Sequence, residues 1–352
     1  MALTDIRLQN YRSYIEGSFE LSPGVNIVVG PNATGKSNLI ESLLLTLSAQ
    51  AYRGKDELVN NTKEWARVDI HTDKNELRTL KIKRTQGKDE HIYEIDKRVY
   101  KRLPFTQRSP AVLFEPNNLF LLHDDPSGRR TYFDQLISQN IKEHASLLLK
   151  YKRTLAQRNT LLKTRPDDEN QLFVWSLRLS ELASKVIKAR QEVLEEINRK
   201  ISETYSKIAN KKSSIKLEYK SGVSIKGDYS ANLLKKLEQT IAEDRLRGFT
   251  TSGPHRDDFM VYLNDKLAAH NASRGEVRTI ILTLKIIQLE LLEESSGKKP
   301  LFLLDDVFSE LDGSRRKSLT NYLEKYQTII TTTDADIILK SFSQKTQIIP
   351  LS

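Results

Sequence analysis

The chain has 352 residues, enough for two or three domains, and 56 lysines and arginines against 46 acidic residues give it a formal net charge of +10. Cysteine is absent, which excludes disulfides, thiolate zinc sites and cysteine nucleophiles and fits a reducing cytoplasm. We find no signal-peptide pattern and no apolar run approaching about 18 residues, so we expect a cytoplasmic protein without a membrane span.

The N-terminal third has the pattern of a mixed α/β domain. Short apolar or alternating runs predict strands at 2–8, 19–21, 25–29, 68–71, 77–84, 92–95 and 111–114.

A phosphate-binding loop follows the strand at 25–29 and opens a helix. Its eight residues are Gly30, Pro31, Asn32, Ala33, Thr34, Gly35, Lys36 and Ser37, with the P-loop spacing G-x-x-x-x-G-K-[ST]. The glycines permit a tight turn, so that backbone N–H groups and the start of the helix surround the phosphates. Lys36 would reach the β- and γ-phosphates, and the Ser37 hydroxyl would ligate Mg²⁺. The motif predicts a nucleoside triphosphate; the alternative is a glycine-rich turn before an ordinary helix.

The excess of positive charge is clustered, at 81–84, 97–102, 150–153 and 207–212. Such a balance favours a polyanionic partner such as DNA, and Tyr100 and Tyr151 within two of the clusters could stack on bases. The alternative is a basic surface that serves solubility alone.

Residues 128–208 carry almost no strand signal. Apolar residues recur every three or four positions from 173 to 208, which predicts a helix about 54 Å long. Residues 141–163 could pair with it as an antiparallel hairpin that turns at 164–170. We expect a protruding helical arm; a helix packed onto its own domain is the alternative.

The C-terminal part returns to an α/β pattern. We expect strands at 215–219, 259–263, 301–304 and 328–331, and helices at 231–246 and 277–294. We therefore predict one nucleotide-binding core assembled from both ends of the chain, with the helices inserted between them.

Two C-terminal motifs complement the P-loop. The buried strand at 301–304 ends in Asp305, which could hold Mg²⁺, and Asp306, which could orient or deprotonate an attacking water. About thirty residues earlier, Ser273 and Gly275 open a long helix. In isolation Ser273 with Glu276 is a capping box, but the position matches the signature motif of ABC-type ATPases.

Seven segments in this order resemble the RecF family, SMC-like ABC-type ATPases of bacterial DNA replication and repair. They are residues 8–14, 30–37, 113–119 (with 126–130 and 133–134 after it), 252–258, 273–276, 305–312 and 331–334. The resemblance implies an α/β fold: an ABC-type P-loop ATPase head assembled from both chain ends, with an inserted helical arm domain. The parts would be 1–120 with the P-loop, 121–245 as the arm, and 246–352 with the signature, acidic strand and switch.

The resemblance also implies roles for single residues. Arg12 would approach the phosphates, and Ser273 and Gly275 would contact ATP bound to a second subunit. Asp312 would lie in the loop that crosses the dimer interface, and Thr333 stands where many ABC ATPases carry a switch histidine. The catalytic residues would be Lys36 and Asp306, and the metal ligands Ser37 and Asp305.

The implied function is ATP-dependent DNA binding in recombinational repair and replication. The protein would bind single-stranded, gapped or double-stranded DNA, form a homodimer on ATP, hydrolyse ATP slowly, and help RecO and RecR load RecA during the SOS response. Arg274 departs from the usual signature of the family. Asp306 resembles the family but is one methylene shorter than the glutamate common in other ABC ATPases.

Other classes stay open. A transporter nucleotide-binding subunit, a P-loop kinase for small molecules and a non-hydrolysing scaffold share parts of the pattern. For His255, Asp257 and Asp258 we favour a structural or DNA-contacting role over a metal site, because their spacing matches no defined ligand set.

Overall fold

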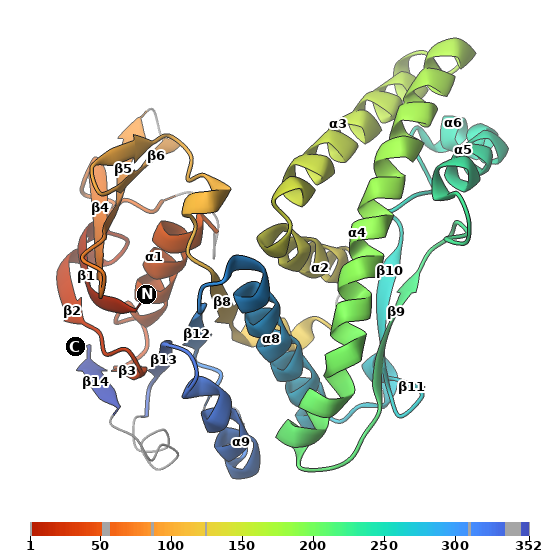
Figure 1. The fold of residues 1–352 in the computed structure, drawn as a ribbon. Helices are drawn as coiled ribbons and strands as arrows, with labels where there is room; N and C mark the ends of the chain where they lie inside the picture. The colour runs from red at the N-terminus through yellow and green to blue at the C-terminus, as the bar shows by residue number, and fades with distance from the viewer. Residues whose placement is uncertain are drawn as a thin grey trace. The chain divides into compact units, whose positions relative to one another are not determined.

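The computed structural model describes residues 2–50, 57–85, 88–123, 125–308, 311–334 and 346–351 (Figure 1). These residues form two compact units, and each has its own buried apolar clusters. The first unit comprises 1–119, 207–211 and 278–352, and the second comprises 120–206 and 212–277. Residues 246–277, which we assigned to the ATPase head from the sequence, thus group with the second unit.

A five-stranded parallel sheet organises the first unit. Its strand order is β14 (Gln347–Pro350), β3 (Val25–Val29), β13 (Thr328–Thr332), β12 (Leu301–Asp305) and β8 (Ala111–Phe114). All five residues of β12 and of β13 are buried, as expected for the centre of a parallel sheet. Because parallel strands end at one edge, the P-loop, Asp305 and Thr332 meet there. β14 was not predicted.

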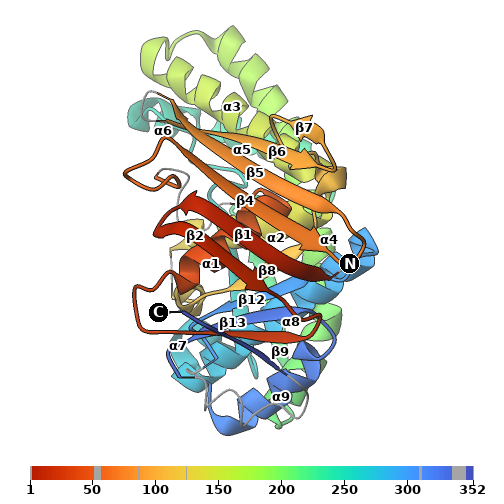
Figure 2. The same cartoon turned by 90° about the vertical axis from the view of Figure 1, so that its left-hand side faces the viewer.

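A six-stranded antiparallel sheet forms the other layer of this unit (Figure 2). The core between the two sheets contains α1 (Lys36–Ser48), whose leucines pack with apolar residues of both. α1 is apolar on nearly all sides because it is buried on nearly all sides. The strands, in sheet order, are β2 (Tyr14–Glu20), β1 (Leu3–Tyr11), β4 (Trp65–Thr72), β5 (Leu77–Thr85), β6 (Lys88–Ile95) and β7 (Arg98–Tyr100).

Two helices follow the signature segment. α8 (Arg274–Ser296) begins in the second unit and continues in the first, and α9 (Gly313–Leu323), which was not predicted, follows β12. Arg315 of α9 donates from Nε to Thr279 Oγ1 of α8 at 2.6 Å, which ties the two helices together. Short 3₁₀ turns occur at Phe105–Gln107 and Pro116–Phe120.

The second unit contains the long helices. α3 (Lys142–Thr164) and α4 (Glu169–Ala209) lie side by side as the predicted hairpin, and the turn predicted within 164–170 occupies 165–168 (Figure 1). With 41 residues, α4 is about 62 Å long. It packs with α3 and α5 (Tyr229–Gln239) around one apolar cluster, so the inserted helices form a lobe with its own core.

The remaining elements of this unit are helices α2 (Pro126–Asn140), α6 (Ile241–Arg247) and α7 (Ala268–Asn271), and strands β9 (Ile215–Lys220), β10 (Asp258–Leu263) and β11 (Lys266–Leu267). The single helix predicted at 231–246 is wrong: it is interrupted at Thr240, which ends α5. The Thr240 hydroxyl donates to the Lys236 carbonyl at 2.9 Å. Side-chain bonds of this kind compete with the backbone hydrogen bonds that would continue the helix. No helix among the described residues combines the length and apolar character needed to cross a bilayer.

Candidate nucleotide site

The two glycines of the P-loop are required by close contacts. Gly35 has φ +100°, and a Cβ there would lie 2.9 Å from Ser13 Oγ and 3.0 Å from the Tyr14 ring. A Cβ on Gly30 would lie 2.5 Å from the Leu351 carbonyl oxygen. The Tyr14 hydroxyl also donates to the Gly35 carbonyl at 3.1 Å. The loop is therefore confined by residues at the β1–β2 turn on one side and by Leu351, just after β14, on the other.

Lys36 lies buried against the loop that precedes it. Its side chain is 4% exposed, and Nζ donates to the carbonyls of Gly30 and Pro31 at 2.8 Å each. Thr34 Oγ1 donates to the same Pro31 carbonyl at 3.0 Å. The three intervening residues Pro31, Asn32 and Ala33 are exposed, and Ala33 is left-handed at φ 70°. The ammonium group is thus held by an open, tightly curved loop.

The P-loop and the acidic strand meet at one hydrogen-bonded cluster. Ser37 Oγ donates to Asp305 Oδ1 at 3.1 Å, and Thr331 Oγ1 donates to the same oxygen at 2.7 Å. Asp305 is 3% exposed. The strand order places β13 between β3 and β12, so Thr331 joins the two motifs across 268 residues of sequence separation.

This donor set fits Mg²⁺. Hydroxyl and carboxylate oxygens are the hard ligands that Mg²⁺ prefers, and it usually takes only one or two from protein and the rest from water and phosphates. Ser37 and Asp305 would hold the ion. Elsewhere among the described residues, no group of three or more His, Asp or Glu side chains is arranged to hold a metal.

Asp306 has an unusual conformation at the edge of the sheet. Its φ is +54°, a left-handed value that costs free energy outside glycine, and its N–H donates to Thr331 Oγ1 at 3.0 Å. Burial raises the pKa of Asp306, nearby Lys36 lowers it, and Asp305 raises it again. A carboxylate with a raised pKa is a better proton acceptor, which is the property that a general base needs.

Arg12 is held by a partner that the sequence interpretation missed. Its Nε and Nη2 donate to the two carboxylate oxygens of Glu41, both at 2.9 Å, and the Tyr11 hydroxyl adds a bond to Glu41 at 3.2 Å. This pairing raises the pKa of Arg12. Glu41 is 1% exposed on α1, one turn after the P-loop. The sequence did carry a signal for this contact, because Glu41 is the one charged residue within the mostly apolar run 39–45.

A second buried charge lies on α8. Lys285 is 6% exposed, and burial lowers its pKa to about 7, an effect partly offset by the carboxylate of Glu115. Glu115 follows β8 at the carboxyl edge, since Phe114 pairs with Leu304 just before Asp305. The sequence interpretation assigned no role to either residue.

The start of α8, where the signature motif was predicted, has the capping box that Ser273 and Glu276 suggest in isolation. Ser273 Oγ and its N–H both donate to Glu276 Oε2 at 2.8 Å, and the Glu276 N–H donates to Ser273 Oγ at 3.3 Å. Ser273 and Arg274 are exposed and Gly275 is half-buried. The second unit therefore presents an ordered helix N-terminus to solvent.

The remaining predicted positions follow β12 and β13 in the chain. Asp312 caps α9 by accepting from the Arg315 N–H at 2.9 Å and also pairs with the Arg315 guanidinium. Thr333 is exposed, whereas Thr332 is buried and its carbonyl accepts from the Gly30 N–H at 3.3 Å. Ser309 and Glu310 of the acidic motif lie outside the described residues.

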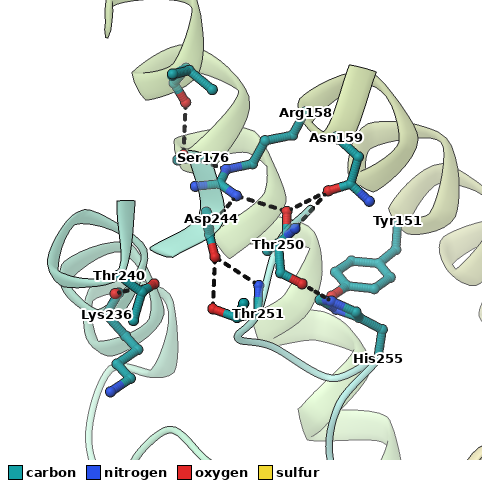
Figure 3. Close-up of polar contacts among 11 residues, drawn as sticks. Tyr151, Arg158, Asn159, Ser176, Lys236, Thr240, Asp244, Thr250, Thr251 and His255 are labelled. Atoms are coloured by element: carbon teal, nitrogen blue, oxygen red, sulfur yellow. Dashed lines mark hydrogen bonds and ion pairs between the residues drawn. The ribbon is translucent and has the colours of Figure 1, made fainter. Parts of the chain in front are cut away.

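The segment around His255 is internal to the second unit (Figure 3). The Tyr151 hydroxyl donates to His255 Nδ1 at 2.7 Å, and Nε2 donates to the Thr250 carbonyl at 3.1 Å. Burial lowers the pKa of His255 to about 4, so the ring is neutral. Asp257 accepts from the Tyr219 hydroxyl at 2.6 Å. Tyr151 is 3% exposed, so the prediction that it could stack on bases is wrong: its ring lies in the core.

Comparisons with known proteins agree on one family. The family model described as RecF/RecN/SMC N terminal domain matches residues 2–349. The chain is 36% identical over 335 residues to the DNA replication and repair protein RecF of Clostridium beijerinckii, covering 94% of this chain and 91% of that protein. It is 31% identical over 353 residues to RecF of Clostridium perfringens, covering 99% and 97%.

Solved structures give the same result. A structure of the recombination mediator protein RecF-ATPrS in the RecFOR pathway matches with a TM-score of 0.87, 30% identity, and coverage of 99% of this chain and 95% of that one. An SMC head bound to the C-winged helix domain of ScpA matches with a TM-score of 0.53 and 15% identity, covering 99% and 94%, which is a likeness of fold alone. The chain therefore has the fold of an ABC-type ATPase head and belongs to the RecF family.

Proposed function

We propose that the protein is an ATP-dependent DNA-binding protein of DNA replication and recombinational repair that works in the cytoplasm. The observation that carries this proposal is the cluster in which Ser37 of the P-loop meets Asp305 of the acidic strand, in a chain of the RecF family. Relatives over 30% identical are named DNA replication and repair proteins, and one solved relative is described as RecF-ATP.

In this proposal the P-loop residues 30–37 bind the phosphates of ATP, and Lys36 exchanges its loop carbonyls for phosphate oxygens. Bound Mg²⁺ would supply positive charge beside the phosphates, and Ser37 and Asp305 would hold it. Arg12 lies on the segment that confines the loop and would approach the phosphates from there.

Asp306 is the proposed general base. Its raised pKa and its position one residue after Asp305 favour this role, and its short side chain limits its reach to a water. We therefore expect slow hydrolysis that serves as a switch, with a turnover below about 10 s⁻¹. A faster turnover would contradict this role for Asp306.

ATP would act by closing a homodimer. The exposed capping-box helix start, with Ser273 and Gly275, is suited to contact the γ-phosphate of ATP bound to a second copy, because helix N-termini attract anions. Arg274 would add a cation there, and Asp312 and Thr333 would complete the interface. ATP can drive closure only if it binds the closed dimer more tightly than the open monomer.

The proposed partners are DNA and proteins of the RecO and RecR type. Solved relatives are described as recombination mediators of the RecFOR pathway. By this analogy the protein would help to load the RecA recombinase at single-strand gaps and support the SOS response.

The test is the anisotropy of a labelled gapped duplex titrated with protein in Mg-ATP, Mg-ADP or no nucleotide. We expect binding that requires ATP and that Lys36→Met abolishes. The control is Lys185→Met. Lys185 is exposed on α4, so this substitution removes the same charge at a position far from the loop in sequence. Full ATP-dependent binding by Lys36→Met would refute the site; binding indifferent to nucleotide in the wild type would refute the coupling.

A further inference from the structure

One side of α3 is exposed and strongly cationic. We define the α3 basic face as Lys142, Lys150, Lys152, Arg153 and Lys163, all of which are exposed. Glu143 is the single acidic residue of this 23-residue helix. The opposite side carries the buried Tyr151, Arg158 and Leu162.

The charges of the α3 basic face are not neutralised within the described chain. None of its five cations forms an ion pair with another described residue, whereas the exposed side of α4 is mixed, with Lys188 paired to Glu192 and Arg199 to Glu196. The two helices lie side by side, so they provide a direct contrast (Figure 1).

Another basic cluster identified in the sequence also differs from the α3 basic face, because two of its cations form ion pairs. In the cluster at 81–84, Lys81 Nζ lies 2.6 Å from Glu94 and Arg84 Nε lies 3.3 Å from Asp89, through pairing of β5 with β6. Those charges are compensated by their neighbours on the sheet.

The spacing of the α3 cations suits a long, regular array of phosphates. From Lys142 to Lys163 the helix rises about 32 Å, close to the length of one turn of B-DNA. At 3.6 residues per turn, Lys142 and Arg153 share the centre of the face and the other three cations flank it. The exposed residues between them are mostly small or uncharged: Ala145, Ser146, Leu149, Ala156, Gln157 and Thr160. A rod-shaped partner can therefore approach the α3 basic face closely.

We propose that the α3 basic face binds the phosphate backbone of double-stranded DNA. This inference rests on the proposed DNA-binding function, for which the α3 basic face would be the contact surface. A duplex carries one negative charge per about 1.7 Å, a density that rewards several aligned cations. Single strands are usually held by bases stacked on exposed aromatic rings, and the α3 basic face has none because Tyr151 is buried. Contacts of this kind give affinity without sequence preference.

The experiment measures duplex affinity against salt concentration in Mg-ATP, using a labelled duplex of about 30 base pairs. Each phosphate contact contributes about −0.9 to the slope of log K against log salt. The variant Lys150→Gln/Lys152→Gln/Arg153→Gln should therefore reduce the magnitude of the slope by up to about 2.7 and weaken binding at least roughly tenfold. Its ATP affinity should stay unchanged, and its circular dichroism spectrum and urea midpoint should match those of the wild type, which verifies that the second unit, where α3 lies, is folded.

The matched control is Lys185→Gln/Lys188→Gln/Arg199→Gln on α4, with the same change in net charge. We expect its slope to equal that of the wild type. An equal loss in both variants would overturn the proposal in favour of bulk charge. A second comparison replaces Lys97, Arg98 and Lys101 of the β6–β7 hairpin with glutamine; a slope lowered there but not by the α3 variant would also overturn it.

Other results separate the surface from the function. If wild-type protein binds the duplex in an ATP-dependent way and the α3 variant has the wild-type slope, the assignment of DNA binding to the α3 basic face is wrong and the proposed function stands. If the wild type binds no DNA under any nucleotide, both fail. Selective loss of single-strand affinity would overturn the assignment to duplex, and unchanged duplex affinity with lost polyglutamate binding would assign the face to an acidic protein.

Discussion

Arg158 and Asp244 form an ion pair that the second unit buries completely (Figure 3). Arg158 Nη1 donates to Asp244 Oδ2 and to Thr250 Oγ1, both at 2.7 Å, and Nε donates to Ser176 Oγ at 2.9 Å. Asp244 Oδ1 accepts from the Thr251 N–H at 2.9 Å and from its hydroxyl at 2.7 Å. The pair thus joins α3, α4, α6 and the loop that leads to His255.

We predict a large loss of stability for Asp244→Ala. The change removes three hydrogen bonds to the carboxylate and leaves a guanidinium without its counter-charge at 0% exposure. Breaking one partner of a buried pair typically costs about 3–5 kcal/mol, whereas replacing both partners by apolar residues is often close to neutral. The double variant Arg158→Met/Asp244→Leu should therefore recover about 2 kcal/mol or more of the loss.

The chain offers a reporter for the second unit alone. Its two tryptophans are Trp65 in the first unit and Trp175 in the second, where Trp175 packs on the cluster of Leu161, Leu162 and Leu172. Trp65 is 48% exposed, so Trp65→Phe should be mild and leave Trp175 fluorescence to follow unfolding in urea. With a slope near 2 kcal/mol/M, the expected loss lowers the midpoint by about 2 M.

The control for this prediction lies on the same helix as Asp244. Glu243 forms an exposed pair with Arg247 at 2.8 Å, and Glu243→Ala should cost at most about 1 kcal/mol. The reasoning would be refuted if Asp244→Ala cost no more than Glu243→Ala, or if the double variant were no more stable than the single one.

Three further predictions concern the first unit. Gly35→Ala should weaken binding of a fluorescent ATP analogue at least roughly tenfold, because φ +100° and the adjacent tyrosine ring exclude a Cβ; Gly24→Ala, with open space around it, should bind normally. For Lys285, a folded pKa of about 7 below the unfolded value means that the unfolded chain binds more protons between about pH 7 and 10, so this group makes stability rise with pH there. Lys285→Met should raise the urea midpoint at pH 7 and flatten that rise, and equal pH slopes in both proteins would contradict the burial argument. Glu41→Gln should lower the free energy of unfolding by about 2 kcal/mol by weakening the bidentate contact with Arg12, which urea titration followed by circular dichroism would test.

Much of the first unit could be predicted because its signals are local. The strand, loop and helix around the P-loop are contiguous in sequence, and glycine spacing reports directly on backbone conformation. The strands β3, β8, β12 and β13 were expected near their observed bounds, since buried strands of a parallel sheet are unbroken apolar runs. The capping box at Ser273 is equally local, and the sequence offered it as the interpretation of that segment in isolation.

Contacts between distant residues explain what the sequence interpretation missed. Tyr151 looked like an exposed aromatic among basic residues, but α3 turns that position toward Leu179 and Val186 of α4. Two cations of the basic cluster at 81–84 are compensated, because strand pairing brings Lys81 near Glu94 and Arg84 near Asp89. A charge run shows its composition along the chain, but not which of its charges are neutralised across a sheet.

The sequence by itself determined the P-loop, the acidic strand end and the family pattern, because each depends on neighbouring residues. Only the tertiary structure decided that Leu351, just after the last strand, confines Gly30, that Glu41 holds Arg12, and that Thr331 joins Ser37 to Asp305. The physical reason is that hydrogen bonds and steric contacts act over a few ångströms, whatever the separation in sequence. Folding alone brings those groups within that range.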